Sequence, residues 1–337
     1  MILMLGSCTV LINGSKSSVL LNHGFMPFMS SSAAAQHRSH ILFGSLCVLM
    51  SAFLFAIKAI FIKKAYGLDP TLTAPTLLAL RMLSALPFFL LIVYFSPKPL
   101  EKTTAKDWGI LLIAGLVGYY LASILDFIGL TYITASLERI ILFLYPTLTV
   151  LMMAVLYKRP IHMRVIMAII LSYGGTLTVM LGEGAQTNPT GVLAGSLFVF
   201  ASAFAYALYL VMTPTLIRRF GSWRFTGLAM SVACIASLIH YLIVQPAPIE
   251  HFTHLAPTII GYGVALGIFS TVLPATFLMQ GIARVGPAQA AMLSAGGPII
   301  TVVLAVAFLG ESLSWVQWIG CALNIIGVLM ITLKPAK

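Results

Sequence analysis

Two long uncharged apolar stretches near the C-terminus restrict what this chain can fold into. Residues 285–310 and 312–333 contain no Asp, Glu, Lys or Arg over 26 and 22 positions respectively. A helix rises about 1.5 Å per residue, so about 20 apolar residues cover the roughly 30 Å hydrocarbon core of a bilayer. Of the 337 residues, 60% are hydrophobic and only 8% are charged, which excludes a soluble domain and a disordered chain. These stretches therefore predict membrane-spanning helices.

Similar apolar stretches recur along the chain. Their length and continuity favour helices over the short alternating strands of a membrane barrel. Residues 1–40 contain only short apolar pieces, so we expect a poorly ordered N-terminal tail there. The predicted fold class is an all-α polytopic membrane protein with ten transmembrane helices, at residues 41–62, 75–95, 109–128, 135–157, 163–182, 191–213, 225–244, 257–279, 286–309 and 314–333.

The basic residues lie mostly on one side of the predicted membrane. With the N-terminus inside, fourteen Lys and Arg residues fall on the inner side and two on the outer side. Cytoplasmic loops carry such an excess of positive charge, so we expect a multi-pass protein of the inner (plasma) membrane with both termini cytoplasmic. The inner residues are Lys16, Arg38, Lys98, Lys102, Lys106, Lys158, Arg159, Arg164, Arg218, Arg219, Arg224, Arg284, Lys334 and Lys337; the outer ones are Lys63 and Lys64, alongside Asp69, Glu183, Glu250 and Glu311.

The chain contains an internal repeat. A shift of 151 positions aligns eight identical residues within the thirteen positions from Gly44 to Ala56 onto Gly195 to Ala207. Each half of the chain holds five predicted helices, so the second half must cross the membrane in the opposite sense, as in many secondary transporters. We predict two inverted five-helix repeats, residues 41–182 and 191–333. A shift of 152 aligns Gly115 with Gly267, Gly129 with Gly281, Pro146 with Pro298 and Gly175 with Gly327.

Three short segments resemble a known family. They are Ala79-Leu80-Arg81 in the second span, Ala135-Ser136-Leu137 leading to Pro146 in the fourth, and Pro298 followed by Gly310-Glu311 in the ninth. Together with the ten-helix, two-repeat pattern, they make the chain similar to EamA-like permeases of the drug/metabolite transporter superfamily. The resemblance implies a carrier of small organic metabolites, with a cavity lined chiefly by the third, fourth, eighth and ninth spans, and efflux as its most frequent use.

Five ionisable residues lie within predicted spans of the first repeat, near the outer side: Lys58, Arg81, Asp126, Glu138 and Arg139. Inserting such a charge costs about 2.5–3.5 kcal/mol, so each is a functional candidate. The five sum to one excess cation. We expect Arg81 or Arg139 to receive a carboxylate or similar anionic group, and Asp126 and Glu138 to couple transport to protons. Alternatively, Arg81 with Glu138, and Arg139 or Lys58 with Asp126, form structural ion pairs or snorkel to the surface.

Two prolines near the middle of the fourth and ninth spans mark further candidates. Pro146 and Pro298 each leave the carbonyl about four residues earlier without its helical donor, which is tolerated only against protein or a wet cavity. Tyr145 supplies a hydroxyl at this depth, and Ser294 belongs to a small polar face before Pro298. These four residues are predicted either to line a solute pathway or to form a close helix contact.

Enzyme motifs are absent from the sequence. It has no HExxH, GxSxG, P-loop or GxGxxG motif, and its four cysteines lack metal-ligand spacing. We expect a secondary transporter that moves an amino-acid-like or other carboxylate-bearing solute outward by alternating access, in contact with lipid, with protons as the candidate coupling ion and without metal, cofactor or nucleic acid. The alternatives are a non-transporting membrane scaffold or sensor, and an intramembrane enzyme that pairs a serine with His240. Substrate identity and oligomeric state stay open.

Overall fold

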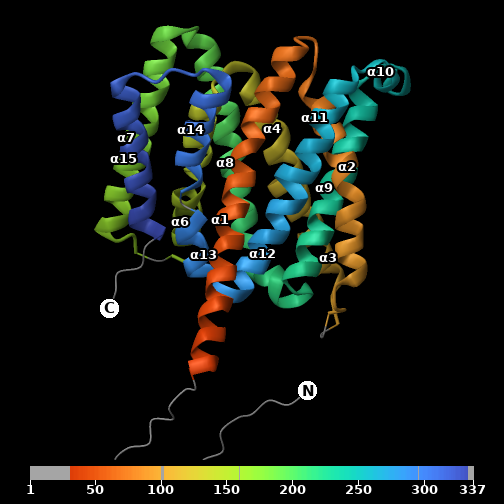
Figure 1. Cartoon of the computed structure of the whole chain (residues 1–337), viewed down its shortest axis with the longest axis vertical. Coiled ribbons are helices and arrows are strands. Elements are labelled where there is room, and N and C mark those ends of the chain that lie inside the picture. Colours follow the sequence, from red (N-terminus) through yellow and green to blue (C-terminus); the bar gives the residue numbers. More distant parts are fainter. Residues whose placement is uncertain (1–30, 100–101, 159, 295, 333–337) are drawn as a thin grey trace, which may run out of the picture. The chain divides into compact units, whose positions relative to one another are not determined.

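The computed structural model describes residues 31–99, 102–158, 160–294 and 296–332. Residues 1–30 of the predicted tail, with Lys16, lie outside the described residues, as do Arg159, Lys334 and Lys337. The chain divides into a unit of residues 1–39 and a unit of residues 40–337, and the architecture below is that of the second unit. Within the described ranges the protein is helical and contains no strand (Figure 1).

The first repeat consists of five helical segments, two of which are interrupted. Its third segment contains a π-helical stretch, and its fourth breaks before Pro146. The segments are α1 (Ser31–Leu68), α2 (Ala74–Phe95), α3–η1–α4 (Ala105–Gly115, Leu116–Leu121, Ala122–Tyr132), α5 with α6 (Ala135–Leu142, Tyr145–Leu156) and α7 (Met163–Gln186).

The second repeat reproduces these interruptions at equivalent places. The stretch η2 lies where η1 lies in the first repeat, and the ninth segment breaks before Pro298. One short helix that we did not predict, α10 (Pro248–His254), joins the seventh and eighth segments. The segments are α8 (Pro189–Phe220), α9 (Ser222–Val244), α11–η2–α12 (Pro257–Gly267, Ile268–Val272, Leu273–Val285), α13 with α14 (Pro287–Ser294, Gly297–Leu309) and α15 (Trp315–Thr332).

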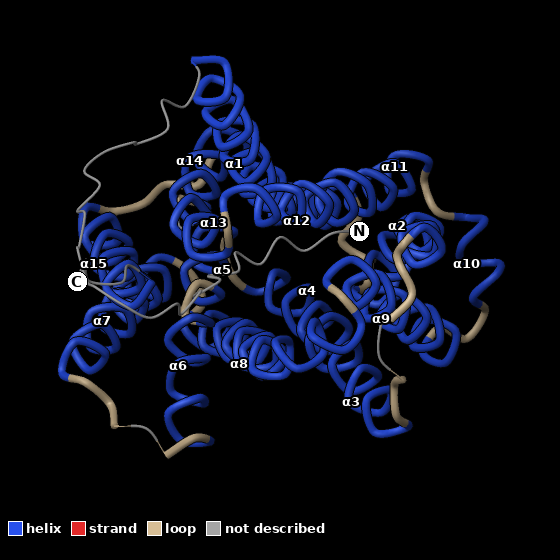
Figure 2. Tube along the Cα trace, turned by 90° about the horizontal axis from the view of Figure 1, so that it is seen from below, coloured by secondary structure: helices blue, strands red, loops and turns tan. Residues whose placement is uncertain are grey.

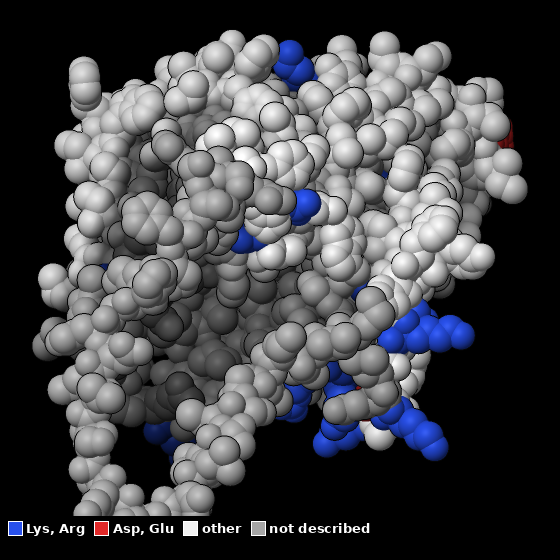
Figure 3. All heavy atoms as spheres, turned by 60° about the horizontal axis from the view of Figure 1, so that its bottom comes forward, with Lys and Arg blue, Asp and Glu red and all other residues white. Residues whose placement is uncertain are grey.

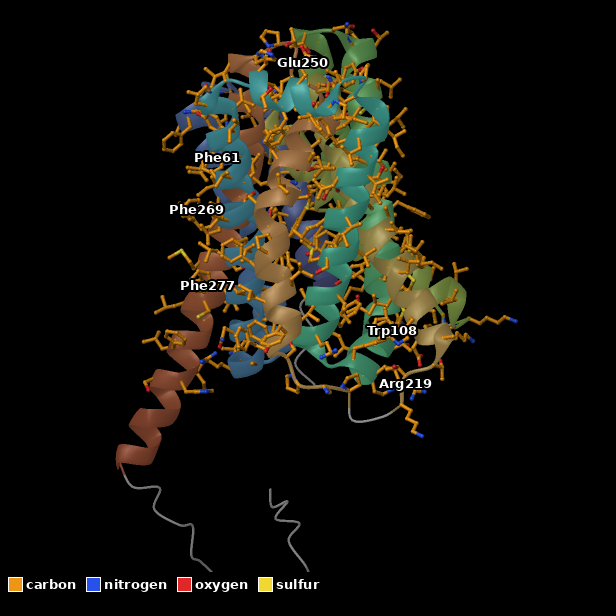
Figure 4. The ribbon with its side chains drawn as sticks, turned by 90° about the vertical axis from the view of Figure 1, so that its right-hand side faces the viewer. Phe61, Trp108, Arg219, Glu250, Phe269 and Phe277 are labelled. Carbon is orange, nitrogen blue, oxygen red and sulfur yellow. The ribbon has the colours of Figure 1, made fainter. Side chains whose placement is uncertain are left out.

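The predicted spans correspond to these segments. Among the described residues, eight helical segments are long and apolar enough to cross a membrane, and two shorter apolar helices, Gly297–Leu309 and Trp315–Met330, occupy the ninth and tenth predicted spans. Large apolar side chains face outward along their length; Phe269, for example, is 49% exposed (Figure 4). The fold class is confirmed as an all-α polytopic membrane protein with a repeated five-helix unit.

The helix breaks have a local cause in proline chemistry. Proline has no backbone N–H, so the carbonyl four residues earlier loses its hydrogen-bond donor, and the proline ring also crowds that carbonyl. Helix α5 accordingly ends at Leu142, four residues before Pro146, and α13 ends at Ser294, four residues before Pro298. In each case proline then occupies the first turn of the next helix, where no such donor is needed.

Equivalent residues of the two repeats touch each other at two places. The Cys234 Sγ of α9 lies 3.7 Å from the Met82 Sδ of α2, and the Asn324 side-chain amide of α15 donates to the Ser172 carbonyl of α7 at 3.1 Å. Both pairs are 152 residues apart, which is the repeat offset. Residues related by a two-fold rotation meet only at the rotation axis, so the pseudo-two-fold axis passes through the α2–α9 and α7–α15 contacts, which lie on opposite sides of the helix bundle (Figure 2).

Small residues hold each repeat against the other. A Cβ at Gly129 of α4 would lie 3.0 Å from the Gly195 carbonyl oxygen of α8. A Cβ at Gly281 of α12 would lie at the same distance from the Gly44 carbonyl oxygen of α1. Helices in a membrane associate through such close backbone approaches. The duplicated glycines therefore make the same contact twice, each time between helices of different repeats.

The two ends of the bundle differ in charge. Figure 4 shows Glu250 at one end, and Trp108 and Arg219 at the other. Several Lys and Arg side chains gather toward this second end in Figure 3. The helix directions place Asp69, Glu183, Glu250 and Glu311 at the first end, which we call the acidic end, and Lys98, Lys102, Lys106, Lys158, Arg164, Arg218, Arg219, Arg224 and Arg284 at the second, which we call the basic end.

Candidate functional site

Three of the five predicted intramembrane charges form one buried charge cluster: Lys58 of α1, Asp126 of α4 and Glu138 of α5. The Lys58 Nζ lies 2.6 Å from the Asp126 Oδ2 and 3.1 Å from the Glu138 Oε1. Both carboxyl side chains are buried, Glu138 completely. The other oxygen of each, Asp126 Oδ1 and Glu138 Oε2, has no hydrogen-bond partner among the described residues. Of the ion pairs considered from the sequence, only Lys58 with Asp126 forms.

Two further carboxylates fix the N-terminus of α5. Glu138 lies one turn inside this helix, so its position is fixed as well. Glu183 of α7 accepts from the Thr134 backbone N–H at 2.8 Å and from the Thr134 hydroxyl at 2.5 Å. Glu311, beyond α14, accepts from the Ala135 N–H at 2.7 Å and from the Ser136 hydroxyl at 2.6 Å. The free N–H groups and the dipole of a helix N-terminus both stabilise such anions.

Glu311 reaches α5 because the chain turns sharply after α14. Gly310 ends that helix with a φ of 68°, in the left-handed region that favours glycine. Glu311 belongs to the second repeat and α5 to the first, so this contact joins the repeats at the acidic end. The residue 152 positions earlier than Glu311 is Arg159, so the sequence provides no matching carboxylate at the basic end.

Within the described part of the chain, Arg81 of α2 forms no ion pair with the buried charge cluster, although its positive charge acts on the Asp126 carboxyl. Its Nε donates to the Thr271 hydroxyl of η2 at 2.8 Å, and its guanidinium lies over the Phe127 ring at 5.4 Å. Thr271 in turn donates to the Leu266 carbonyl at 2.8 Å, five residues earlier. The π-helical stretch thus turns the Thr271 hydroxyl oxygen toward Arg81. The Arg81 guanidinium therefore has one of its hydrogen-bond donors satisfied within the protein.

Arg139 of α5 forms no ion pair with an Asp or Glu among the described residues. Its Nε is buried without a hydrogen-bond partner among the described residues, although the side chain as a whole is only half-buried. A Cβ added to Gly297 of α14 would lie 3.1 Å from the Arg139 Nη2, so a larger residue there would crowd the end of the Arg139 side chain. Arg139 is also close enough to the Tyr145 and Tyr206 rings to interact with them electrostatically. A guanidinium whose Nε lacks a hydrogen-bond partner among the described residues therefore lies between the two repeats.

Aromatic side chains form a wall beside Arg139. Tyr145 of α6 and Tyr206 of α8 meet edge to face at 5.1 Å, and Tyr206 stacks on Tyr209 at 5.6 Å. The Tyr209 hydroxyl lies 2.8 Å from the hydroxyl of Tyr119, in η1. Tyr209 is the repeat counterpart of Lys58 by the 151-residue shift, so a neutral tyrosine pair stands where the first repeat has its buried charge cluster.

The remaining predicted residues lie at the helix breaks. Tyr145 and Pro146 begin α6, Ser294 ends α13 and is half-buried, and Pro298 is buried in the first turn of α14. Gly297, which precedes Pro298, faces Arg139. His240, the residue considered for an enzyme, packs edge to face against the Tyr120 ring at 5.8 Å.

Several residues of the site were not predicted from the sequence. Thr271, Tyr206 and Tyr209 lie in apolar runs in which many Thr and Tyr side chains serve packing alone. The repeat offset contained one usable signal, because it aligns Lys58 with Tyr209. Glu183 and Glu311 were identified as acids of the outer side, and Glu311 also as part of the family-like Gly310-Glu311 pair, but no local pattern connects either of them with residue 134 or 135.

The comparisons with known proteins agree with this architecture. The sequence profile of the EamA-like transporter family matches residues 42–181 and 193–333, once in each repeat. The chain is 31% identical over 283 residues to "Uncharacterized transporter YcbK" of Bacillus subtilis (strain 168), covering 82% of this chain and 89% of that protein. It is 27% identical to "Uncharacterized inner membrane transporter YicL" of Salmonella typhimurium (strain LT2), covering 69% of this chain and 75% of that protein.

A solved crystal structure has the same fold at 18% sequence identity, with a TM-score of 0.57, and the match covers 85% of this chain and 95% of that one. Family profile, relatives and fold agree over both repeats. This chain therefore belongs to the EamA-like transporter family, within the drug/metabolite transporter type, and is a multi-pass membrane transporter of a small molecule.

Proposed function

We propose that this protein is a secondary transporter that moves a small carboxylate-bearing metabolite, such as an amino-acid-like solute, by alternating access. The observation that carries this proposal is the Arg139 guanidinium, unpaired at Nε and lying between the repeats opposite Gly297. An arginine left without a partner inside a membrane is costly unless something anionic joins it. Its planar fork binds a carboxylate with two parallel hydrogen bonds.

The choice of Arg139 over Arg81 follows from their contacts. Arg81 is buried and donates to Thr271. Among the described residues, Arg139 has no such acceptor for its Nε, and its side chain is only half-buried. Arg81 then acts as a positioning residue that connects α2 with η2, while Arg139 receives the solute. The tyrosine wall of Tyr145 and Tyr206 supplies apolar contact for the rest of the solute.

Alternating access requires contacts that break at one end while others form at the opposite end. In this conformation the acidic end is joined by Glu311 of the second repeat bound to the N-terminus of α5. Breaking that contact would open the site toward the acidic end. We propose that the basic end of the protein and both termini of the chain face the cytoplasm of the inner (plasma) membrane, and that net transport is efflux, driven by the outward gradient of the solute.

Transport by vesicles containing the purified protein tests this function. We would load them with a panel of labelled amino acids, organic acids and nucleosides and follow release. We expect release of at least one carboxylate-bearing solute, and a loss of about ten- to a hundredfold in the Arg139→Gln variant, because a hydrogen bond to a charged group contributes about 1.5–3 kcal/mol. Arg218→Gln, an exposed arginine of the basic end, is the matched control and should transport normally.

Two results would contradict the proposal. Equal transport by the wild type and by Arg139→Gln would remove Arg139 from the site. Wild-type protein that is folded and correctly inserted, but moves no member of the panel, would favour the scaffold or sensor alternative.

A further inference from the structure

The buried charge cluster brings two carboxyl groups to one ammonium group. The Lys58 Nζ is the only cation within 4.0 Å of Asp126 or Glu138 among the described residues, and it contacts one oxygen of each. The other two oxygens, Asp126 Oδ1 and Glu138 Oε2, lack hydrogen-bond partners. The two carboxyl groups are also close enough to each other to interact. Lys58 therefore balances one negative charge of two.

A shared proton would complete this arrangement. A buried carboxylate oxygen without a hydrogen bond is strongly disfavoured when ionised. One proton placed between the two carboxyl groups converts an unpartnered acceptor into a donor, gives the other unpartnered oxygen its hydrogen bond, and leaves one carboxylate to balance Lys58. Like-charged carboxyl groups sharing one site bind such a proton for the same reason.

The groups that face the two carboxyl groups come from three helical segments. Lys58 lies on α1, together with Tyr66, whose hydroxyl donates to the Phe127 carbonyl at 3.1 Å. Arg81 of α2 lies over the Phe127 ring, and its positive charge acts on the Asp126 carboxyl. Arg139 follows Glu138 on α5, and its positive charge acts on the Glu138 carboxyl. Arg139 is thus the charged group common to the cluster and to the proposed solute site.

We propose that Asp126 and Glu138 together hold one exchangeable proton, and that this proton crosses the membrane in the same direction as the anionic solute bound at Arg139. The first half stands on the geometry of the cluster, and the second rests on the proposed function. When no solute is bound at Arg139, the Arg139 charge favours the ionised form of the neighbouring Glu138. When a carboxylate neutralises Arg139, that support is lost and the protonated form is favoured.

Solute and proton therefore promote each other's binding, since such coupling is reciprocal. The protonation step adds a proton from water to a carboxylate oxygen, and the release step returns it to water on the other side, with no change of oxidation state. A monoanionic solute with one proton moves without net charge. The proton site exists once, because the repeat counterparts of Asp126 and Glu138 are Leu278 and Ala290.

The proton site can be tested without any solute by infrared spectroscopy of the purified protein in lipid nanodiscs. We expect a carboxylic acid C=O band at about pH 7, where ordinary Asp and Glu are ionised. Asp126→Asn and Glu138→Gln should each remove the band, because each leaves a single carboxylate paired with Lys58. Glu250→Gln, an exposed acid of the acidic end, should leave it unchanged. A wild-type spectrum without the band, or a band that persists in both variants, overturns the proton site.

The direction of coupling is tested in vesicles that contain a pH-sensitive dye. With a panel solute that the wild type moves, an imposed solute gradient should carry protons in the same direction, at about one proton per solute, and Glu138→Gln should lose this proton flux while still exchanging labelled for unlabelled solute. Protons moving in the opposite direction, or wild-type transport without proton movement, overturn the coupling. If no panel solute moves, the proposed function fails while the infrared result still decides the proton site.

Discussion

The Glu311 carboxylate accepts a hydrogen bond from the Ser136 hydroxyl at 2.6 Å and another from the Ser136 backbone N–H at 3.1 Å, although the two residues are 175 positions apart. This contact joins the second repeat to the first at the N-terminus of α5. That helix carries both Glu138 of the buried charge cluster and Arg139 of the proposed solute site. Movement of the repeats at the acidic end would therefore act directly on both sites.

Weakening this contact should change which end of the protein is open. Glu311→Gln keeps the shape of the side chain but removes the charge that the helix N-terminus stabilises, at a cost of about 0.3–2 kcal/mol. In a background without native cysteines, Ser294→Cys should then react faster with a membrane-impermeant thiol reagent added at the acidic end. Glu250→Gln is the control. Unchanged labelling would show that Glu311 does not hold that end closed.

The contact between α7 and α15 predicts opposite outcomes for two neighbouring glycines. A Cβ at Gly175 would lie 2.6 Å from the Asn324 backbone nitrogen and closer still to the Gly320 carbonyl oxygen, and backbone atoms cannot move aside cheaply. A Cβ at Gly174 meets nothing within 4 Å. Gly175→Val should lose most folded protein in detergent size-exclusion chromatography, whereas Gly174→Val should elute as the wild type does. Similar yields from both variants would contradict this helix contact.

Removing the acceptor of Arg81 should lower stability more than it alters solute binding. Thr271→Val leaves the buried Arg81 Nε without its 2.8 Å partner, which costs about 1–3 kcal/mol. We expect a lower melting temperature in detergent with little change in KM. Thr276→Val is the control, because the Thr276 hydroxyl bonds only to its own helix. A large rise in KM without loss of stability would instead make Arg81 part of the solute site.

Folding should depend on Lys58 only while both carboxyl groups of the buried charge cluster are present. Lys58→Met leaves Asp126 and Glu138 without a cation, and breaking a buried ion pair from one side costs about 3–5 kcal/mol. Adding Asp126→Asn removes one of the two ionisable carboxyl groups and should restore much of the folded yield, since Glu138 alone can stay neutral. The measurement is the fraction of monodisperse protein after purification. A Lys58→Met protein as stable as the wild type would show that Lys58 does not stabilise the fold.

The sequence was a good guide wherever hydropathy alone decides the structure. Length and composition predicted the ten helical segments, eight of which are long and apolar enough to cross a membrane. The repeat offset predicted that α8 to α15 would reproduce α1 to α7, with Pro146 and Pro298 disturbing the helix hydrogen bonds at equivalent places. The loss of a backbone donor at proline is local chemistry. It therefore acts at the same place in both repeats, although α2 and α8 continue through Pro87 and Pro214.

The partners of the buried charges depend instead on which faces of the helices meet. Lipid and protein interior are both apolar, so a transmembrane helix carries no clear stripe that marks its inner face. For this reason the sequence left Arg81 and Arg139 equivalent, and it assigned Glu183 and Glu311 to the surface. Only the tertiary structure places Lys58 between Asp126 and Glu138, gives Arg81 to Thr271 and leaves Arg139 unpaired. The sequence determined that charges are buried in this membrane protein, and helix packing determined which of them are satisfied.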